Sequence, residues 1–295
     1  MARLVAIVLR GGAAYDPTNF SLWEKRGYHI TPVHFYQPVP DTRELAQLLY
    51  PRISKCPGID LQSEPQARLL REVFPQYAEE YNNFPAKQSL TDISFYLDND
   101  AFTGIDPHVY HCMVRHFQPR TIIEVGSGYS TLLAAQAIQR NATGRLIAVD
   151  PWPRDFIAAG VEKMELVCRK VEELTPEFFL QLQANDILFV DSSHVIRTAG
   201  DVGFLLLEVL PTLRPGVFIH FHDIFLPYDY PKEWLLEKHL FWTEQYLLQA
   251  YLADNSKVEV VFASNFMAHQ HPQALRTVFP KALWWGGGSF WIRKA

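Results

Sequence analysis

A short segment of the chain has residue types that can bind a ligand: TIIEVGSGYSTLL, from Thr121 to Leu133. The run TIIEV fits a strand covered on both faces, and Gly126 and Gly128 allow a tight turn whose backbone can approach a ligand. The helix predicted after the turn directs its free N–H groups toward it. Glu124 is a carboxylate among apolar residues, which would repel a pyrophosphate but accept hydrogen bonds from an ammonium group. The segment favours a zwitterionic ligand such as S-adenosylmethionine (SAM) over a dinucleotide; an ordinary strand-to-helix turn is the alternative.

A second apolar strand ends in an acid at the distance that a nucleotide-type ligand requires. The run RLIAVD places Asp150 26 residues after Glu124 (150 − 124). Nucleotide-binding α/β folds place a carboxylate on the ribose hydroxyls at this point. A helix cap ahead of Pro151 is the alternative role for Asp150.

Two later strands end in residues that can bind metals or move protons. The run DILFVDSSH closes one strand with Asp191 and places His194 three residues later, and GVFIHFHDIFLP closes the next with His222 and Asp223. Because the carboxyl ends of parallel strands meet at one edge of a sheet, we expect these side chains to lie close together at that edge. The alternatives are a helix cap for Asp191 and a structural or substrate-contacting role for His194.

The run EVGSGYS, followed by LIAVD, resembles the class I SAM-dependent methyltransferases from about Asp106 to Ala295. The resemblance implies an α/β fold with a Rossmann-like, seven-stranded, mostly parallel sheet and helices on both faces. It makes residues 106–295 the methyltransferase domain and residues 1–105 an N-terminal extension, a candidate lid or oligomer contact. The cofactor-binding residues that it implies are Glu124, Gly126, Ser127, Gly128, Ser130, Asp150, Trp152 and Glu172. Packing is the alternative for Trp152, and a solvated helix start for Glu172.

The later strand ends resemble those of metal-assisted small-molecule O-methyltransferases. By position, Asp191, His222 and Asp223 look like ligands of a divalent cation (Mg²⁺ or Mn²⁺), and His194 looks like the general base. His222 departs from the pattern, because related sites more often carry Asp or Glu. Nitrogen suits Mn²⁺, Fe²⁺ or Zn²⁺ better than Mg²⁺, so either the metal differs, or His222 only orients Asp223, or no metal binds.

This group of residues suits methyl transfer to a hydroxyl. Displacement at a sulfonium methyl needs a good nucleophile, so an alcohol or phenol must lose its proton as it attacks. A cation can polarise that oxygen and an imidazole can take the proton.

Periodicity predicts the elements that position these groups. The expected strands are 121–125, 145–149, 164–168, 187–190, 217–221, 258–262 and 289–293. The expected helices lie near 109–116, 130–140, 155–162, 176–184, 198–210 and 232–251. The first hundred residues, rich in proline and aromatic residues, show no such alternation.

Composition limits the partners. Of the 295 residues, 48% are hydrophobic and 20% charged, and the net charge is −5 with no long basic run, so neither a nucleic acid nor a membrane surface is indicated. Three widely spaced cysteines suit reduced thiols in a cytosol. The apolar run Leu4 to Leu9 is too short to span a membrane and is read as a strand or packed arm.

The sequence predicts a cytoplasmic SAM-dependent methyltransferase that O-methylates a sugar or secondary metabolite, as in natural-product biosynthesis. It leaves open whether the protein forms a homo-oligomer. One alternative is a metal-free O- or N-methyltransferase. Another is an NAD-dependent oxidoreductase, against which Glu124 and Thr131, in place of a third glycine, argue. A third is a non-catalytic SAM-binding protein.

Overall fold

The computed structural model describes residues 17–48, 53–89 and 93–295. Contacts divide the chain into two compact units: a first unit of Met1–Arg52 with Pro231–Phe241, and a second unit of Ile53–Tyr230 with Trp242–Ala295. The predicted arm Leu4 to Leu9 lies outside the described residues. In the part of the chain that the structure describes, no helix has the length and apolarity needed to cross a membrane.

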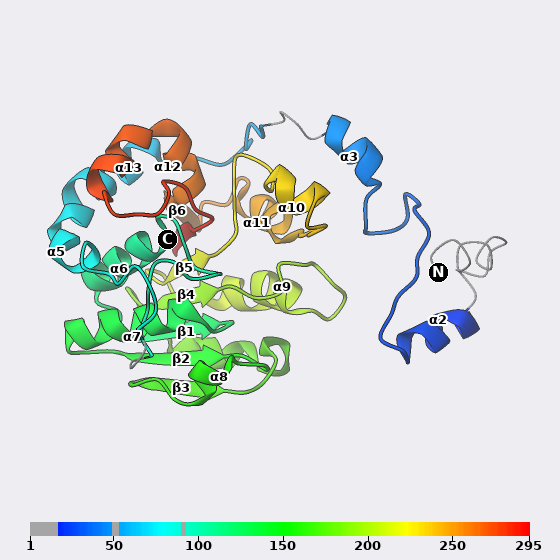
Figure 1. Cartoon of the computed structure of the whole chain (residues 1–295), viewed down its shortest axis with the longest axis horizontal. Helices are drawn as coiled ribbons and strands as arrows, with labels where there is room; N and C mark the ends of the chain where they lie inside the picture. Colours follow the sequence, from blue (N-terminus) through cyan, green and yellow to red (C-terminus); the bar gives the residue numbers. More distant parts are fainter. Residues whose placement is uncertain (1–16, 49–52, 90–92) are drawn as a thin grey trace. The chain divides into compact units, whose positions relative to one another are not determined.

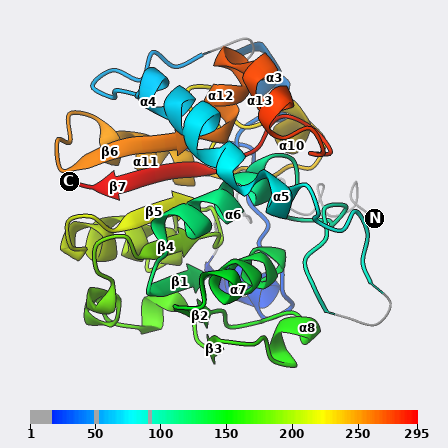
Figure 2. The ribbon, with the colours of Figure 1, turned by 90° about the vertical axis from the view of Figure 1, so that its left-hand side faces the viewer.

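The second unit is built on a seven-stranded sheet in the order β3-β2-β1-β4-β5-β7-β6. The strands are β1 Thr121–Val125, β2 Arg145–Val149, β3 Met164–Val167, β4 Ile187–Val190, β5 Phe218–Phe221, β6 Val258–Ala263 and β7 Phe290–Lys294. All neighbours from β3 to β5 are parallel, whereas β7 runs antiparallel to β5 and β6. The predicted seven-stranded, mostly parallel sheet is confirmed, with each strand within one residue of its predicted bounds (Figure 2).

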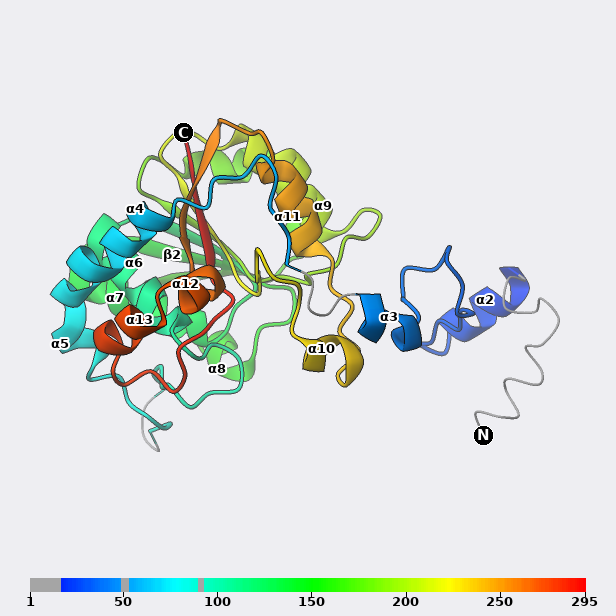
Figure 3. The same ribbon diagram turned by 90° about the horizontal axis from the view of Figure 1, so that it is seen from above.

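Helices cover both faces of this sheet. Helices α6 and α7 lie on one side, and α9 and α11 lie on the other (Figure 3). Their bounds are α6 Asp106–Phe117, α7 Tyr129–Asn141, α8 Asp155–Ala158, α9 Asp201–Phe204 and α11 Glu244–Leu252. Two helices that were not predicted, α12 Ser264–Gln270 and α13 Pro272–Val278, lie between β6 and β7 in the chain.

Four predicted helices were wrong in extent. The one expected over 155–162 is only α8, and the one expected over 176–184 is a 3₁₀ helix, Pro176–Gln181. The one expected over 232–251 is two helices, α10 Lys232–Leu236 and α11, because His239 adopts a left-handed φ of 55° and interrupts the helical backbone. The one expected over 198–210 is only α9, which continues as a π-helical turn, Leu205–Val209. Pro211 then ends it, because proline cannot donate to the helical hydrogen bonds.

The predicted extension is divided between the two units. Its second half belongs to the second unit, where helices α4 Ser63–Arg68 and α5 Ala78–Tyr81 are found and α4 contacts β6. The amide of Ala263 donates to the buried side-chain oxygen of Gln66 at 2.7 Å, which fixes this contact. The first unit contains α2 Pro17–Glu24, α3 Thr42–Leu48 and α10.

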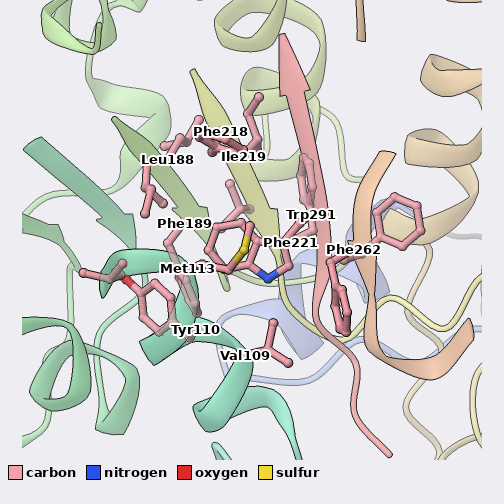
Figure 4. Packing of buried hydrophobic residues seen from close by; sticks show 14 of the residues in the cluster. Val109, Tyr110, Met113, Leu188, Phe189, Phe218, Ile219, Phe221, Phe262 and Trp291 are labelled. Atoms are coloured by element: carbon pink, nitrogen blue, oxygen red, sulfur yellow. The ribbon is translucent and has the colours of Figure 1, made fainter. Parts of the chain in front are cut away.

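Large aromatic side chains fill the space between α6 and the sheet (Figure 4). Tyr110 from α6 packs with ring centroids 5.0 Å from Phe189 of β4 and 5.8 Å from Trp291 of β7. All three are fully buried, and each side chain of this kind removes enough apolar surface from water to contribute roughly 2 to 3 kcal/mol. His220 stacks on Trp291 at 4.2 Å and meets the Ser289 hydroxyl at 2.7 Å, so it is a structural part of this core.

Acid should destabilise this core between about pH 6.5 and pH 4, because burial lowers the pKa of both His108 and His111 to about 4. Each ring is neutral in the folded state and takes up a proton from about pH 6.5 downward only when unfolded. Stability that is present above the unfolded pKa is therefore lost as the pH falls, by at most about 3 kcal/mol per ring. Thermal unfolding at about pH 7.5 and pH 5 should show a smaller fall in Tm for His108→Leu than for wild type. The exposed His269→Gln should behave as wild type, and equal falls in all three proteins would contradict the assignment.

Candidate active site

Four strands of the sheet end at the same edge, because their registers are aligned. Val125 of β1 pairs with Val149 of β2 and Val190 of β4, and Val190 pairs with Phe221 of β5. The residues that follow these strand ends are Gly126, Asp150, Asp191 and His222. The topology thus brings together the four motifs that the sequence analysis singled out.

A cavity of about 450 Å³ opens at this edge. Among the predicted cofactor residues it is lined by Gly126, Ser127, Gly128, Ser130, Asp150, Trp152 and Glu172. Glu124, the eighth, does not line it. Asp191, which was predicted from a different motif, does line it, so the cavity reaches the ends of both β1 and β4.

The turn after β1 depends on the first of its two glycines. Gly126 has a φ of 83°, and a Cβ at this position would lie 1.9 Å from the carbonyl oxygen of Asp191. Gly128 has an extended backbone, and a Cβ there would meet nothing within 4 Å. Gly126 is therefore required by the approach of β4, whereas Gly128 leaves its space open on the cavity side.

Asp150 joins the ends of β1 and β2. One carboxylate oxygen accepts hydrogen bonds from the Ser127 amide at 3.0 Å and the Ser127 hydroxyl at 2.6 Å, and the other accepts from the Trp152 amide at 2.8 Å. The alternative role as a helix cap is wrong, because α8 begins only at Asp155.

Glu124 lies beneath the turn and is completely buried. Burial raises the pKa of its carboxyl to about 8, although a hydrogen bond from the Ser130 hydroxyl at 2.5 Å opposes the shift. Its second oxygen has no hydrogen-bond partner among the described residues. Its predicted contact with a ligand ammonium therefore stays a prediction.

Trp152 and Glu172 lie on the cavity wall near the ends of β2 and β3. The indole is 78% exposed, with the Lys170 ammonium 5.8 Å from its ring, so it is available to a flat ligand and the alternative role in packing is wrong. Glu172 belongs to a short 3₁₀ helix, Val171–Glu173.

Beside the cavity, two carboxylates and two imidazoles face one another. Asp191 Oδ1 lies 3.2 Å from His194 Nε2 and 3.6 Å from His222 Nδ1, and Asp223 Oδ2 lies 3.8 Å and 3.5 Å from the same atoms. Ligand atoms of Asp191, His194 and Asp223 lie within 4.8 Å of one another, close enough to hold one metal ion. The predicted base thus stands in the same group as the predicted ligands, and His222 adjoins it.

Each imidazole is held from behind by a buried carboxylate that sequence reasoning missed. Glu244, at the start of α11, meets His194 Nδ1 at 2.8 Å, and Asp106, at the start of α6, lies 3.4 Å from His222 Nε2. Glu244 was hidden inside the long helix expected over 232–251; a helix start at Thr243-Glu244 was the available signal. Asp106 has no sequence signal, since its distance along the chain from His222 gives no hint of contact.

Charge compensation in this group is mutual. Burial lowers the pKa of His194, but hydrogen bonds to Asp191 and Glu244 outweigh it and raise the pKa to about 10. Burial also lowers the pKa of His222, but the charges of Asp223 and Asp191 outweigh it and raise the pKa well above its usual range. Without a cation, both imidazoles are thus protonated at neutral pH. His194 can accept a proton there only when another positive charge compensates Asp191.

Comparisons with known proteins agree with this geometry. Residues 123–224 match a family model described as a methyltransferase domain. An uncharacterized protein from Archaeoglobus fulgidus is 27% identical over 185 residues, which cover 58% of this chain and 83% of that relative.

Two O-methyltransferases are among the solved structures to which the chain shows a weak similarity. One is TomG from Streptomyces achromogenes, involved in tomaymycin synthesis and solved with SAM (17% identity, TM-score 0.40, covering 86% of this chain and 95% of that chain). The other is from Bacillus cereus, solved with S-adenosylhomocysteine (SAH) (14% identity, TM-score 0.41, covering 86% and 96%).

The segment matched by the family model contains all the predicted cofactor and catalytic residues. It spans the turn after β1, the ends of β2 and β4, and the His222-Asp223 pair after β5. The part of the chain that carries the candidate site, residues 123–224, is thus similar to a methyltransferase domain.

Proposed function

We propose that this protein transfers the SAM methyl group to a hydroxyl of a small molecule, a sugar or secondary metabolite, with the help of a divalent cation. The observation that supports this most is the carboxylate and imidazole group at the ends of β4 and β5. Asp191 belongs both to that group and to the lining of the cavity. A hydroxyl placed there would face a methyl group delivered from the cavity.

In this proposal the cavity binds SAM. The turn at Gly126 and Gly128 leaves room for the amino-acid end of the ligand. Asp150 accepts hydrogen bonds from the ribose hydroxyls, and Trp152 and Glu172 contact the adenine. Asp150 is already fixed by Ser127, so its orientation is set before the ligand arrives.

The group beside the cavity fits a divalent cation. It offers two carboxylates, and the buried His222 Nδ1 has no hydrogen-bond partner among the described residues. We propose Asp191, Asp223 and His222 as the residues that hold the ion. When bound, a divalent cation lowers the pKa of an adjacent hydroxyl by polarising its oxygen.

Proton transfer in this proposal belongs to His194. The acceptor oxygen attacks the methyl carbon, the bond from that carbon to sulfur breaks, SAH leaves, and the hydroxyl proton passes to His194 Nε2. Glu244 accepts the hydrogen bond from Nδ1–H, which leaves Nε2 as the nitrogen that faces the acceptor. Trp242 packs on the imidazole at 4.3 Å and restricts its rotation.

The donor assignment is tested by Asp150→Ala. Loss of the ribose hydrogen bonds should weaken SAM and SAH binding by roughly 1 to 3 kcal/mol. Calorimetric titration of SAH measures this, with the neighbouring Asp155→Ala as the control, because Asp155 does not line the cavity. Unchanged affinity in a folded Asp150→Ala protein would remove Asp150 from the donor site.

A further inference from the structure

We propose that His222 binds the cation through Nδ1, that Asp106 is the positioning residue for this ligand, and that the site consequently prefers Mn²⁺ over Mg²⁺. The inference rests on the proposed function, because it concerns the cation of the same site. Asp106 lies outside the segment that the family model matches.

Two observations favour His222 as a ligand of the cation: its position between two carboxylates, and the absence of a hydrogen-bond partner for its Nδ1 among the described residues. The side chain is 7% exposed, and its Nδ1 lies almost equally far from the two carboxylates, at 3.6 Å from Asp191 and 3.5 Å from Asp223. Both contacts are long ion-pair distances, and Nδ1 has no hydrogen-bond partner in the described part of the chain. A buried polar atom that is left unpaired costs free energy unless something binds it. Atoms that share a cation at about 2.1 Å lie roughly 3 to 3.4 Å apart, close to these separations.

His194 does not occupy the equivalent position. Its Nε2 lies closer to Asp191, at 3.2 Å, than to Asp223, at 3.8 Å. His194 Nε2 therefore faces one carboxylate, whereas His222 Nδ1 lies between the two. The geometry separates a ligand, His222, from a proton acceptor, His194.

Asp106 fixes the far side of the His222 ring. Its carboxylate lies 3.4 Å from Nε2 and accepts hydrogen bonds from the amides of Gly288 at 2.7 Å and Ser289 at 3.2 Å. It is 2% exposed, and a Cβ on Gly287 would lie 2.1 Å from Oδ1, so the glycine loop closes directly over it. A carboxylate held in this way directs Nδ1 toward the cation site, as outer carboxylates do for other metal-binding histidines.

A third contact prevents the ring from turning away. Phe102 packs on His222 with centroids 5.1 Å apart, and Phe102 is itself 2% exposed. The Asn99 side chain accepts from the amides of Ala101 and Phe102 and donates to the Phe102 carbonyl, which fixes the loop that carries this phenyl ring.

The ligand set decides the cation. Mg²⁺ prefers oxygen ligands in a strict octahedron and loses its water reluctantly, whereas imidazole suits Mn²⁺, Fe²⁺, Co²⁺ and Zn²⁺. Two carboxylates and one imidazole, with Asp106 behind the ring, therefore favour the second group.

The test uses the full chain and the Mn²⁺ and Mg²⁺ ions as probes. Calorimetry gives the affinity for each ion, and pulsed electron paramagnetic resonance of bound Mn²⁺ detects nitrogen ligands through their hyperfine coupling. We expect nitrogen coupling in wild type and in His194→Gln, and its loss in His222→Asp. Replacing the imidazole by a carboxylate should also lower the ratio of Mn²⁺ to Mg²⁺ affinity by about tenfold or more.

Asp106→Asn should retain the nitrogen coupling but weaken Mn²⁺ binding by about 10- to 100-fold. The matched control is Asp186→Asn. Asp186 is equally buried and accepts the backbone amides of Arg120, Thr121 and Gln183 at the opposite edge of the sheet. This variant should bind Mn²⁺ like wild type. SAH affinity and Tm establish that each variant is folded.

Two results would overturn the inference without harming the proposed function. One is bound Mn²⁺ that shows no nitrogen coupling. The other is coupling that persists in His222→Asp and disappears in His194→Gln. If neither ion binds and methyl transfer survives chelation, the cation in the proposed function fails as well.

Discussion

His194→Ala should lower kcat by about 10² to 10⁴ while SAM affinity stays nearly unchanged. The imidazole faces the Asp191 and Asp223 carboxylates, where the acceptor hydroxyl would bind, and it does not line the donor cavity. Its removal should therefore affect proton transfer and leave the methyl donor in place. Turnover and SAH affinity are measured on the same preparations, with an acceptor found by screening hydroxylated compounds.

Glu244→Gln is the informative companion to this variant. The amide retains an oxygen that can accept the hydrogen bond from His194 Nδ1–H at the observed 2.8 Å contact, but it removes the charge. We expect an intermediate loss of kcat. Normal turnover in His194→Ala, or a defect confined to SAM binding, would move His194 to a structural or donor-side role.

Chelation should abolish most methyl transfer, and addition of Mn²⁺ should restore it. Without the ion, the neighbouring carboxylates raise the pKa of His194 and of His222, so both imidazoles keep their protons. The acceptor hydroxyl then has neither a cation to polarise it nor a base to take its proton. SAH affinity should survive, because the donor cavity is formed by the ends of β1 to β3 and by the segment after β4.

The measurement is initial rate before and after exhaustive EDTA treatment, with SAH calorimetry on the same samples. Full activity after chelation would show a metal-free methyltransferase. Asp191 and Asp223 would then serve only to pair with the two imidazoles.

The strands were predictable because their signals are local. The strands that form the site, β1, β2, β4 and β5, are short and mostly apolar runs followed by a polar residue or a glycine, and burial on both faces makes such runs continuous. The alignment of Gly126, Asp150, Asp191 and His222 at one edge then follows from parallel topology alone. This part of the site could be placed without coordinates.

The missing parts of the site depend on distant contacts. Asp106 reaches His222 across more than a hundred residues of chain, and Glu244 reaches His194 only because the helical backbone breaks before α11. Neither contact leaves a periodic trace in the sequence. The depth of Glu124 could not be predicted either: the motif was recognised, but the position of Glu124 within the strand buries its carboxylate beneath the turn, and its contact with a ligand stays a prediction.

The most direct test of the central claim is calorimetric titration of the full chain with SAH and, in parallel, with NAD, in the presence of Mn²⁺. We expect SAH to bind at one site per chain and NAD to bind far more weakly, because Glu124 and the open turn at Gly128 suit an amino-acid end and not a pyrophosphate. Binding of NAD tighter than that of SAH would contradict the donor assignment and, with it, the proposed methyl transfer.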